Sequence, residues 1–457
     1  MRHILKYDSI VVGSGQGGNP LAQQLASRGE RVALLESGPL GGTCINTGCT
    51  PTKTMVASAQ IAHYARNASR WGVHTGNVRV HLPDVLERKN KVVAEFRSGW
   101  EKKVDQPGKP ELHRGRARFT ATKRLLVGEE TVEANRIFID TGASPTIPRI
   151  QGLDAVPYLT NATLLDLAEL PNHLIVLGGG YVGLEFGQMF HRFGSEVTVI
   201  QSNQRILPQE DDDVAEALQK VLQSKGLRIE VNARAQAVEQ KNGTIQVTLA
   251  NGEIVAGSHL LVAVGRTPNT KDLDLEKTGV KTNEKGYIVV NDRLETSAPE
   301  IWALGDVTGG PAFTHISYND YQIVYGNLFE GKDLKTSTRI VPYAVFTDPV
   351  LGRVGLTEKE ARASGRKLKI GKVEMTHVAR AIERDETRGF MKIVVDAATD
   401  KVLSAAILGV EGGELVQALH VLMLADKPYT LLKGAIYIHP TLMEGFFGLM
   451  DSVKEVE

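Results

Sequence analysis

Short apolar runs alternate with amphipathic stretches along the first part of the chain, and glycine punctuates the first alternation. The apolar run 9–12 leads into a glycine triplet spaced G-x-G-x-x-G, formed by Gly13, Gly15 and Gly18. A stretch with helical periodicity follows, and then a second apolar run at 32–35 that ends at Glu36. This alternation predicts a strand, a tight turn, a helix and a second strand.

The same pattern returns further along the chain. Apolar runs at 174–177 and 197–200 enclose a second triplet, formed by Gly178, Gly180 and Gly183. A polar residue again follows the second run, but here it is Gln201 and not an acid. The sequence therefore predicts two strand–turn–helix–strand units.

A glycine triplet between a strand and a helix can hold the pyrophosphate of a dinucleotide. Gly13 permits the tight turn, Gly15 lets the backbone approach a pyrophosphate, and Gly18 lets helix and strand pack closely. The helix N-terminus then faces the phosphate charge. Glu36 comes 18 residues after Gly18 and is placed to bond a ribose 2′-hydroxyl. We predict one dinucleotide site in each unit.

Gln201 leaves the coenzyme of the second unit open. A carboxylate at this position would repel the 2′-phosphate of NADP, whereas a neutral amide can bond a 2′-hydroxyl without excluding a phosphate. Arg205 is the only cation between Gln201 and Asp211. NAD and NADP both remain candidates.

Length and composition limit the class of protein. A chain of 457 residues that is 42% apolar and holds 46 glycines suits a globular α/β protein with several domains. Lys and Arg number 53, as do Asp and Glu, so the zero net charge gives no support for nucleic acid or an anionic membrane as partner. No apolar run approaches the ~18 residues that a membrane helix needs. The start of the chain is too quickly polar for a secretory signal, and we expect a cytoplasmic protein.

The chain has two cysteines, Cys44 and Cys49, and they stand close together. Because thiols stay reduced in the cytoplasm, such a pair favours catalysis or metal binding over a structural disulfide. Zinc sites use three or four Cys or His ligands, and the nearest histidine is His63, so metal binding is disfavoured. Two buried apolar cysteines are the plain alternative. Two dinucleotide sites beside two redox thiols suggest that electrons pass among all three.

Seven motifs in order give nearly the whole chain a resemblance to the pyridine nucleotide-disulfide oxidoreductases. These FAD enzymes include dihydrolipoamide dehydrogenase, glutathione reductase and mercuric reductase. The motifs are the triplet at 13–18, GGTCINTGCTPTK (41–53), IDTGASP (139–145), GGGYVGLEFG (178–187), VGRTPNT (264–270), IWALGDVTGG (301–310) and YIHPTLMEGF (437–446). The chain most resembles the dihydrolipoamide dehydrogenase and mercuric reductase branch. The run AFTHISYNDYQIVYGNL also resembles bacterial metal- and oxidant-linked reductases of that branch.

The resemblance assigns the redox chemistry to the two cysteines. Cys49 is then the thiolate next to the flavin, and Cys44 is the interchange thiol that meets the substrate. We predict a long helix that begins at Cys49, and a helix N-terminus lowers the pKa of a thiol. Lys53 follows one helical turn later, and the resemblance implies that it lies near the flavin N5, paired with Glu185.

Further residues are implied to bind the two cofactors. For FAD they are the first triplet with Glu36, Gly42, Thr43, Lys53, Gly142 and Asp306. We expect Asp306 at the end of a strand formed by IWALGD. For NAD or NADP they are Gly178, Gly180, Tyr181, Gly183, Gln201 and Gly265, with Tyr181 gating the nicotinamide.

His439 and Glu444 are implied to form an acid–base pair. His439 precedes Pro440, so we expect it outside a helix, and Pro440 can open a helix that carries Glu444. An imidazole suits a general base for a thiol, and a carboxylate would orient it and stabilise its cation. In the family this histidine serves the disulfide of the other subunit. The resemblance therefore implies a homodimer with shared active sites.

The expected fold class is α/β, with two Rossmann-like dinucleotide-binding domains and a C-terminal α+β dimerisation domain. We place the FAD domain at 1–150 and 272–341, the NAD(P) domain at 151–271 and the dimerisation domain at 342–457. Within the last, GFMKIVVDAATDKVLSAAILGV predicts two strands around a turn, and GELVQALHVLMLAD predicts a helix.

The expected function is electron transfer between NAD(P)H, FAD, a Cys44–Cys49 disulfide and a small thiol or disulfide, as in dihydrolipoamide dehydrogenase. Mercuric reductases carry a C-terminal cysteine pair that this chain lacks, and no motif indicates a glutathione pocket. Two alternatives stay open. One is a flavin-dependent reductase of Cu(II), Hg(II) or a quinone, and the other is a non-enzymatic flavoprotein whose redox state controls a partner.

Overall fold

The first sheet has seven strands in this computed structural model, which describes residues 4–456. The strand order is β3-β2-β1-β6-β5-β4, with β17 beside β6. Strands β1, β2, β3, β6 and β17 run parallel to one another. The bounds are β1 (Ile4–Val12), β2 (Val32–Glu36), β3 (Glu111–Arg114), β4 (Ala117–Ala121), β5 (Arg124–Val127), β6 (Glu130–Ile139) and β17 (Ile301–Ala303). Since β17 follows the second sheet in sequence, the chain returns to the first sheet late.

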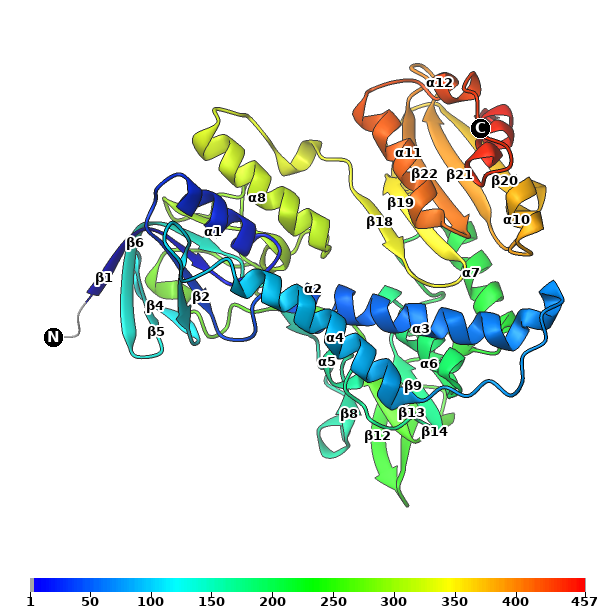
Figure 1. Ribbon diagram of the computed structural model, residues 1–457, viewed down its shortest axis with the longest axis horizontal. Coiled ribbons are helices and arrows are strands. Elements are labelled where there is room, and N and C mark those ends of the chain that lie inside the picture. The colour runs from blue at the N-terminus through cyan, green and yellow to red at the C-terminus, as the bar shows by residue number, and fades with distance from the viewer. Residues whose placement is uncertain (1–3, 457) are drawn as a thin grey trace.

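Helices cover the first sheet because their apolar residues gather on one side. In α1 (Gly18–Ser27), Leu21, Ala22, Leu25 and Ala26 are buried and form one stripe. α8 (Thr314–Phe329) packs against α1 over the same sheet (Figure 1). The predicted first strand is confirmed and begins earlier, at Ile4.

The second sheet is fully parallel, in the order β11-β10-β9-β15-β8. Its strands are β8 (Tyr158–Leu159), β9 (His173–Leu177), β10 (Glu196–Ile200), β11 (Arg228–Glu230) and β15 (His259–Val262). Its helices are α5 (Asn161–Leu164), α6 (Tyr181–Phe193) and α7 (Asp212–Ser224). Two small sheets stand beside it, formed by β12 (Ala235–Lys241), β13 (Thr244–Leu249) and β14 (Ile254–Gly257), and by β7 (Ala143–Pro145) and β16 (Arg266–Pro268). The second predicted strand–turn–helix–strand unit is confirmed.

The C-terminal part of the chain forms a six-stranded antiparallel sheet, in the order β18-β19-β22-β21-β20-β23. Its strands are β18 (Pro342–Val345), β19 (Val350–Gly355), β20 (Leu368–Glu374), β21 (Phe390–Asp396), β22 (Val402–Gly409) and β23 (Lys454–Val456). The accompanying helices are α9 (Glu358–Ala363), α10 (Ala379–Glu383), α11 (Gly412–Leu424), α12 (Thr430–Lys433) and α13 (Phe446–Asp451). Helix α11 packs on β19 and β22 (Figure 1). The predicted strand pair and helix of this part are confirmed.

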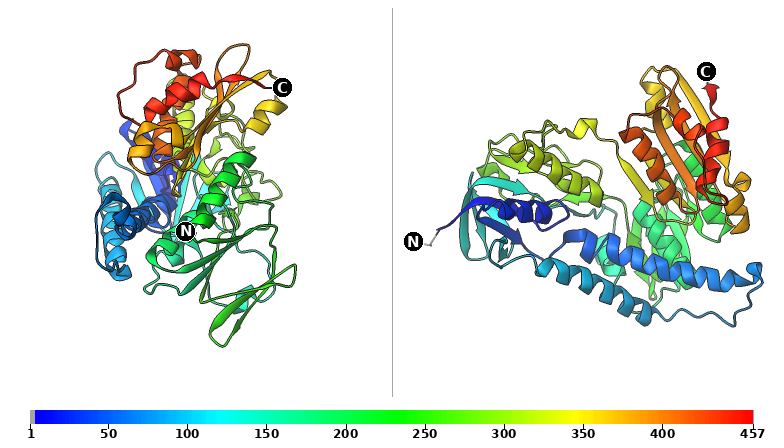
Figure 2. Two further views of the ribbon diagram at one scale, coloured as in Figure 1. Left: turned by 90° about the vertical axis from the view of Figure 1, so that its right-hand side faces the viewer. Right: turned by 45° about the horizontal axis from the view of Figure 1, so that its top comes forward.

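Two long helices connect the parts of the molecule. α3 (Cys49–Asn67) and α4 (Leu82–Glu101) lie side by side, and in the right-hand view of Figure 2 both run along the lower side of the molecule. α3 follows the short helix α2 (Gly42–Asn46) and also packs on α6 of the second sheet. The prediction of a long helix that begins at Cys49 is confirmed.

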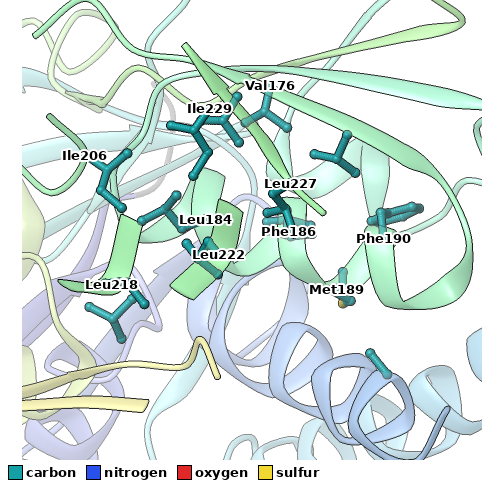
Figure 3. Packing of buried hydrophobic residues seen from close by; sticks show 14 of the residues in the cluster. Val176, Leu184, Phe186, Met189, Phe190, Ile206, Leu218, Leu222, Leu227 and Ile229 are labelled. Carbon is teal, nitrogen blue, oxygen red and sulfur yellow. The ribbon is translucent and has the colours of Figure 1, made fainter. Parts of the chain in front are cut away.

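One apolar cluster joins these parts. Its centre is the packing of α6 and α7 on the second sheet, where Leu184, Phe186 and Leu222 are buried (Figure 3). The same cluster includes Met55 of α3 and Leu351 of β19. The second sheet, the long helix and the C-terminal sheet therefore share one core.

The predicted fold class is confirmed: a mostly parallel first sheet, in which β5 pairs antiparallel with β4 and β6, and a parallel second sheet, both with helices, are followed by a part built on an antiparallel sheet with helices. Within residues 4–456, no helix is both long enough and apolar enough to cross a membrane.

Candidate active site

A large cavity opens at the carboxyl ends of the strands of the first sheet. It has a volume of about 1100 Å³. In an open α/β sheet this edge is where ligands bind. The predicted site residues that line it are Gly13, Gly15, Glu36, Gly42, Thr43, Cys44, Cys49, Lys53, Gly142, Tyr181, Glu185 and Asp306. The structure thus brings together residues that lie far apart in the sequence.

Glycines at one end of the cavity let backbone segments approach each other closely. Gly13 has a φ of +105°, and a methyl group on it would lie 2.2 Å from the backbone oxygen of Asp140. A methyl group on Gly42 would lie 2.9 Å from the Cα of Gly15. Because a side chain at Gly13 or Gly42 would collide with the backbone, only glycine fits at these two positions. We call residues 13–18 and 41–43 the glycine cradle.

Glu36 is fixed at the rim of the glycine cradle. Its Oε2 accepts hydrogen bonds from the Ser14 N–H at 3.0 Å and the Ser14 hydroxyl at 2.6 Å. Its Oε1 accepts from the Gly38 N–H at 2.7 Å. The carboxylate is therefore held in place at the end of β2, as the binding of a ribose hydroxyl requires.

These residues fit FAD. The cradle offers backbone N–H groups at the N-terminus of α1, and the fixed Glu36 lies beside it. The Thr141 hydroxyl at the cavity wall is buried and has no hydrogen-bond partner within residues 4–456. A dinucleotide could thus be bound by main-chain donors, a carboxylate and this hydroxyl.

The two cysteines meet in the cavity. Cys44 lies in α2, Cys49 begins α3, and both are free thiols. The Cys49 Sγ also lies 3.2 Å from the Thr314 hydroxyl. The hydrogen bond from the Cys44 thiol, together with Thr314 and Lys53, lowers the pKa of Cys49 to about 6 against the opposing effect of burial. The same hydrogen bond and burial raise the pKa of Cys44.

We predict that the reduced protein holds one thiolate, on Cys49, down to about pH 6. Since the pKa is lowered, the thiolate is present above that pH and disappears as the pH falls below it. The ultraviolet absorbance of the thiolate, compared with Cys49→Ser at equal flavin content, measures this titration. Thr314→Val removes one hydrogen bond to the sulfur and should move the midpoint upward. Cys44→Ala removes the donor altogether, and an unchanged midpoint in this variant would contradict the hydrogen bond between the thiols.

Lys53 and Glu185 form the predicted pair. Lys53 Nζ lies 2.6 Å from Glu185 Oε2 and 4.7 Å from the centre of the Phe346 ring. The carboxylate of Glu185 is buried, and its other oxygen accepts from the Phe346 N–H at 2.9 Å. The ammonium group is therefore held one helical turn from Cys49.

Aromatic rings form another wall of the cavity. Tyr181 begins α6, and its ring centre is 5.9 Å from that of Phe313. Phe313 also stacks with Tyr343 at 5.1 Å and with His315 at 5.4 Å. The sequence analysis identified only Tyr181, because Phe313, His315 and Tyr343 stand in motifs that give no sign of stacking.

Asp306 lies in the cavity but not at the end of a strand. β17 ends at Ala303, and Asp306 belongs to a 3₁₀ turn at Gly305–Thr308. The expected strand was therefore too long, because Gly305 has a φ of +72° and turns the chain. Arg266, which the sequence analysis did not identify, pairs with Asp306 at 3.2 Å.

The second glycine triplet lies at the carboxyl edge of the second sheet, outside the cavity lining. A methyl group on Gly178 would lie 2.3 Å from the oxygen of Ala263, and one on Gly183 would lie 2.0 Å from the oxygen of Gly178. Gly180, in contrast, faces open space. Its side is open to a ligand, and the triplet fits the pyrophosphate of NAD or NADP.

Gln201 and Gly265 belong to the same edge. Gln201 follows β10 and is buried, with its backbone N–H bonded to the oxygen of Glu230 at 2.8 Å. Gly265 precedes β16 and has a φ of +139°. Arg205 is already paired with Asp212 at 2.7 Å.

His439 and Glu444 contact each other but lie away from the cavity of their own chain. His439 Nδ1 is 3.0 Å from both carboxylate oxygens of Glu444, and the imidazole is 70% exposed. The expected helix opened by Pro440 is wrong: Glu444 lies in a short 3₁₀ helix, Met443–Gly445, ahead of α13. The Thr441 hydroxyl donates to the oxygen of Ile438 at 2.8 Å, which favours a turn over a helix here.

Among residues 4–456, no three His, Cys, Asp or Glu side chains gather into a group that could hold a metal ion.

Two family models together match most of the chain. The family described as pyridine nucleotide-disulphide oxidoreductase matches residues 7–320. The dimerisation domain of the same family matches residues 341–448.

Individual relatives match over most of their length. RclA of Escherichia coli, a probable pyridine nucleotide-disulfide oxidoreductase, is 39% identical over 98% of this chain and 100% of its own. A solved Cu(II) complex of RclA, described as an HOCl-induced flavoprotein disulfide reductase, is similar with a TM-score of 0.89 over 98% of this chain and 99% of that chain, at 38% identity. A dihydrolipoyl dehydrogenase of Thermus scotoductus is 36% identical over 98% of each chain. A mercuric reductase of Bacillus cereus is 37% identical over 90% of this chain and 66% of its own.

Proposed function

The chain belongs to the pyridine nucleotide-disulphide oxidoreductases, a family of FAD-dependent enzymes, and from this we propose that it reduces a small disulfide with electrons from NADH. The observation that carries the proposal is the meeting of Cys44 and Cys49 with Lys53 in one cavity. The family consists of enzymes, so the non-enzymatic alternative is set aside.

In this proposal the glycine cradle, Glu36, Gly142 and Asp306 hold FAD, and the Lys53–Glu185 pair lies near its reactive ring. When bound, FAD would supply two-electron redox chemistry that couples hydride from NAD(P)H to reduction of the Cys44–Cys49 disulfide. The second triplet, Gln201 and Gly265 bind the nicotinamide coenzyme. Tyr181 covers the place where the nicotinamide enters.

The two thiols then act in turn. Cys44 attacks one sulfur of the substrate disulfide, forms a mixed disulfide and releases the first product thiol. The Cys49 thiolate attacks Cys44 Sγ, restores the Cys44–Cys49 disulfide and releases the second product thiol. Its lowered pKa keeps Cys49 reactive at neutral pH, and the positive charge of Lys53 contributes to this.

His439 supplies the proton transfers, and Glu444 orients its imidazole. The dimerisation domain of the family matches this chain, so we infer a homodimer in which His439 of each subunit serves the cysteines of the other. Exposed apolar side chains flank this histidine: Ile436 is 100% and Ile438 is 79% exposed in the single chain. A second subunit would cover them.

The substrate class is a disulfide of the lipoamide kind, and the expected location is the cytoplasm, where thiols are kept reduced. Relatives described as a disulfide reductase and as a dihydrolipoyl dehydrogenase support this class. Steady-state reduction of lipoamide by NADH tests it, and rapid turnover is expected. Oxidation of NADH by Cu(II) without turnover of any disulfide would contradict it and favour the metal-ion alternative. Purified protein without FAD would contradict both.

NADH is proposed as the better coenzyme because two arginines near Gln201, Arg205 and Arg228, are already engaged. Arg205 pairs with Asp212, and Arg228 pairs with Glu230 at 2.6 Å. A 2′-phosphate would therefore find no unpaired cation among these residues to bind.

We expect kcat/KM for NADH to exceed that for NADPH by about tenfold, which corresponds to ~1.4 kcal/mol. Gln201→Glu should widen the ratio by about a further tenfold, since a carboxylate repels the 2′-phosphate. Gln223→Glu, at the exposed end of α7, adds the same charge away from the coenzyme and serves as the control. Equal use of NADPH by the wild type would show that another group neutralises the phosphate.

A further inference from the structure

A buried carboxyl group forms part of the floor of the glycine cradle. Asp140 directly follows β6, lines the cavity, and is 6% exposed. Its Oδ2 accepts a hydrogen bond from the Gly18 N–H at 2.6 Å, at the N-terminus of α1. The sequence analysis gave it no role, although it stands inside the quoted motif IDTGASP.

Glycines surround this carboxyl group closely. Methyl groups on Gly15 and Gly18 would lie 2.8 and 3.0 Å from Oδ2, and one on Gly305 would lie 2.6 Å from Oδ1. The loop that carries Gly15 and Gly18 thus packs against one carboxyl oxygen of Asp140, and the turn at Gly305 packs against the other. The cradle is built to contain the carboxyl group and not only to leave room for a ligand.

The charged groups with the largest effect on Asp140 are carboxylates. They are Glu36 at the end of β2, Asp306 in the 3₁₀ turn and Asp320 of α8. Arg266 pairs with Asp306, and Arg339 pairs with Asp320. Asp140 itself has no ion-pair partner within residues 4–456. Burial, with these acidic neighbours, raises the pKa of Asp140 well above its usual range, against the effect of the Gly18 N–H.

An anionic Asp140 would conflict with the ligand of this site. The pyrophosphate of a dinucleotide brings further negative charge to the N-terminus of α1. A buried carboxylate without a cation would repel it, whereas a neutral carboxylic acid would not and could donate a hydrogen bond.

We propose that Asp140 is an FAD-binding residue that acts as a neutral carboxylic acid, protonated in the FAD-bound enzyme and serving the cradle as a hydrogen-bond donor. This inference rests on the proposed binding of FAD by residues 13–18. A side chain that the protein holds in place would then supply the interaction that a bound cation or water molecule would otherwise have to supply.

Infrared spectroscopy of the FAD-bound protein at pH 7 tests the proposal directly. The wild type should show the carbonyl stretch of a protonated carboxyl group, and Asp140→Asn should lack it. Asp84→Asn, at an exposed aspartate of α4 far from the cradle in sequence, is the comparison and should leave the band in place. Should Asp140→Asn fail to fold, Asp140→Ser, whose smaller side chain fits the same space, should lack the band as well.

The affinity for FAD supplies a second readout. Asn keeps the shape of the side chain and, like a protonated Asp140, carries no charge, so Asp140→Asn should bind FAD with a Kd within about threefold of the wild type at pH 7. If Asp140 were ionised, removing its charge would tighten FAD binding by about tenfold or more. That result, or FAD-bound wild type without the band, would overturn the proposal. Absence of FAD from the wild type would instead overturn the proposed function.

Discussion

Cys44→Ser is expected to abolish the reduction of disulfides, with kcat lowered ~10³-fold or more. The hydroxyl cannot form the mixed disulfide with the substrate, and the chain has no third cysteine that could replace the thiol. Binding of FAD and reduction of the flavin by NADH should persist, because the glycine cradle and the second glycine triplet are untouched. Lipoamide turnover and the absorbance of the flavin measure the two halves of the reaction separately.

Thr47→Ser is the matched control for this variant. Thr47 lies between the two cysteines but does not line the cavity, and its backbone oxygen, which accepts from Asn161 at 2.8 Å, is unchanged. Its turnover should equal that of the wild type. If Cys44→Ser kept more than about a tenth of the wild-type turnover, electrons would reach the acceptor without the disulfide. The enzyme would then be a direct flavin reductase.

His439→Gln is expected to lower disulfide turnover by about 10²- to 10⁴-fold, the usual contribution of a general acid–base residue. Glutamine retains a polar side chain but cannot carry the proton. Single-turnover reduction of the flavin by NADH should be unaffected, since this step does not need the imidazole. The matched control is His377→Gln, an exposed histidine of the same C-terminal part.

Mixed dimers locate the histidine relative to the cysteines it serves. When Cys44→Ser and His439→Gln subunits are mixed equally, half of the dimers contain one of each. If His439 serves the other subunit, each such dimer has one site with both defects and one intact site, so activity returns to about a quarter of the wild type. If it serves its own chain, every site carries a defect and no activity returns.

The sequence predicts much of the two dinucleotide-binding units because their signals are local. An apolar run that ends in a glycine triplet needs only neighbouring residues to form a strand and a turn. The same holds for Cys49, since the start of a helix depends on the residues just around it. For the pairing of Lys53 with Glu185 the chain gives no local signal, and the family resemblance supplied it.

Contacts between residues far apart in the sequence could not be predicted from local signals. Thr314 lies 265 positions from Cys49, and Arg266 finds Asp306 only after the chain has returned to the first sheet. Periodicity shows which face of an element is buried but not what it will contact. The helix expected at Pro440 is absent although the signals there are local. Pro440 suits the start of a helix, but the hydrogen bond from the Thr441 hydroxyl to the oxygen of Ile438 favours a turn.

The shared apolar cluster has a consequence for exchanging parts between relatives. It joins Met55 of the long helix, Leu184 of the second unit and Leu351 of the C-terminal sheet. Arg353, two residues after Leu351 on the same strand and almost fully buried, also pairs with Asp211 at 2.9 Å just before α7. Leaving one partner of such a buried pair uncompensated costs about 3–5 kcal/mol. A chimera that joins the C-terminal part of a relative to this chain must therefore also carry that relative's residues at the contacting positions of the second unit. Without them, the packing between the two parts would be mismatched and the chimera less stable.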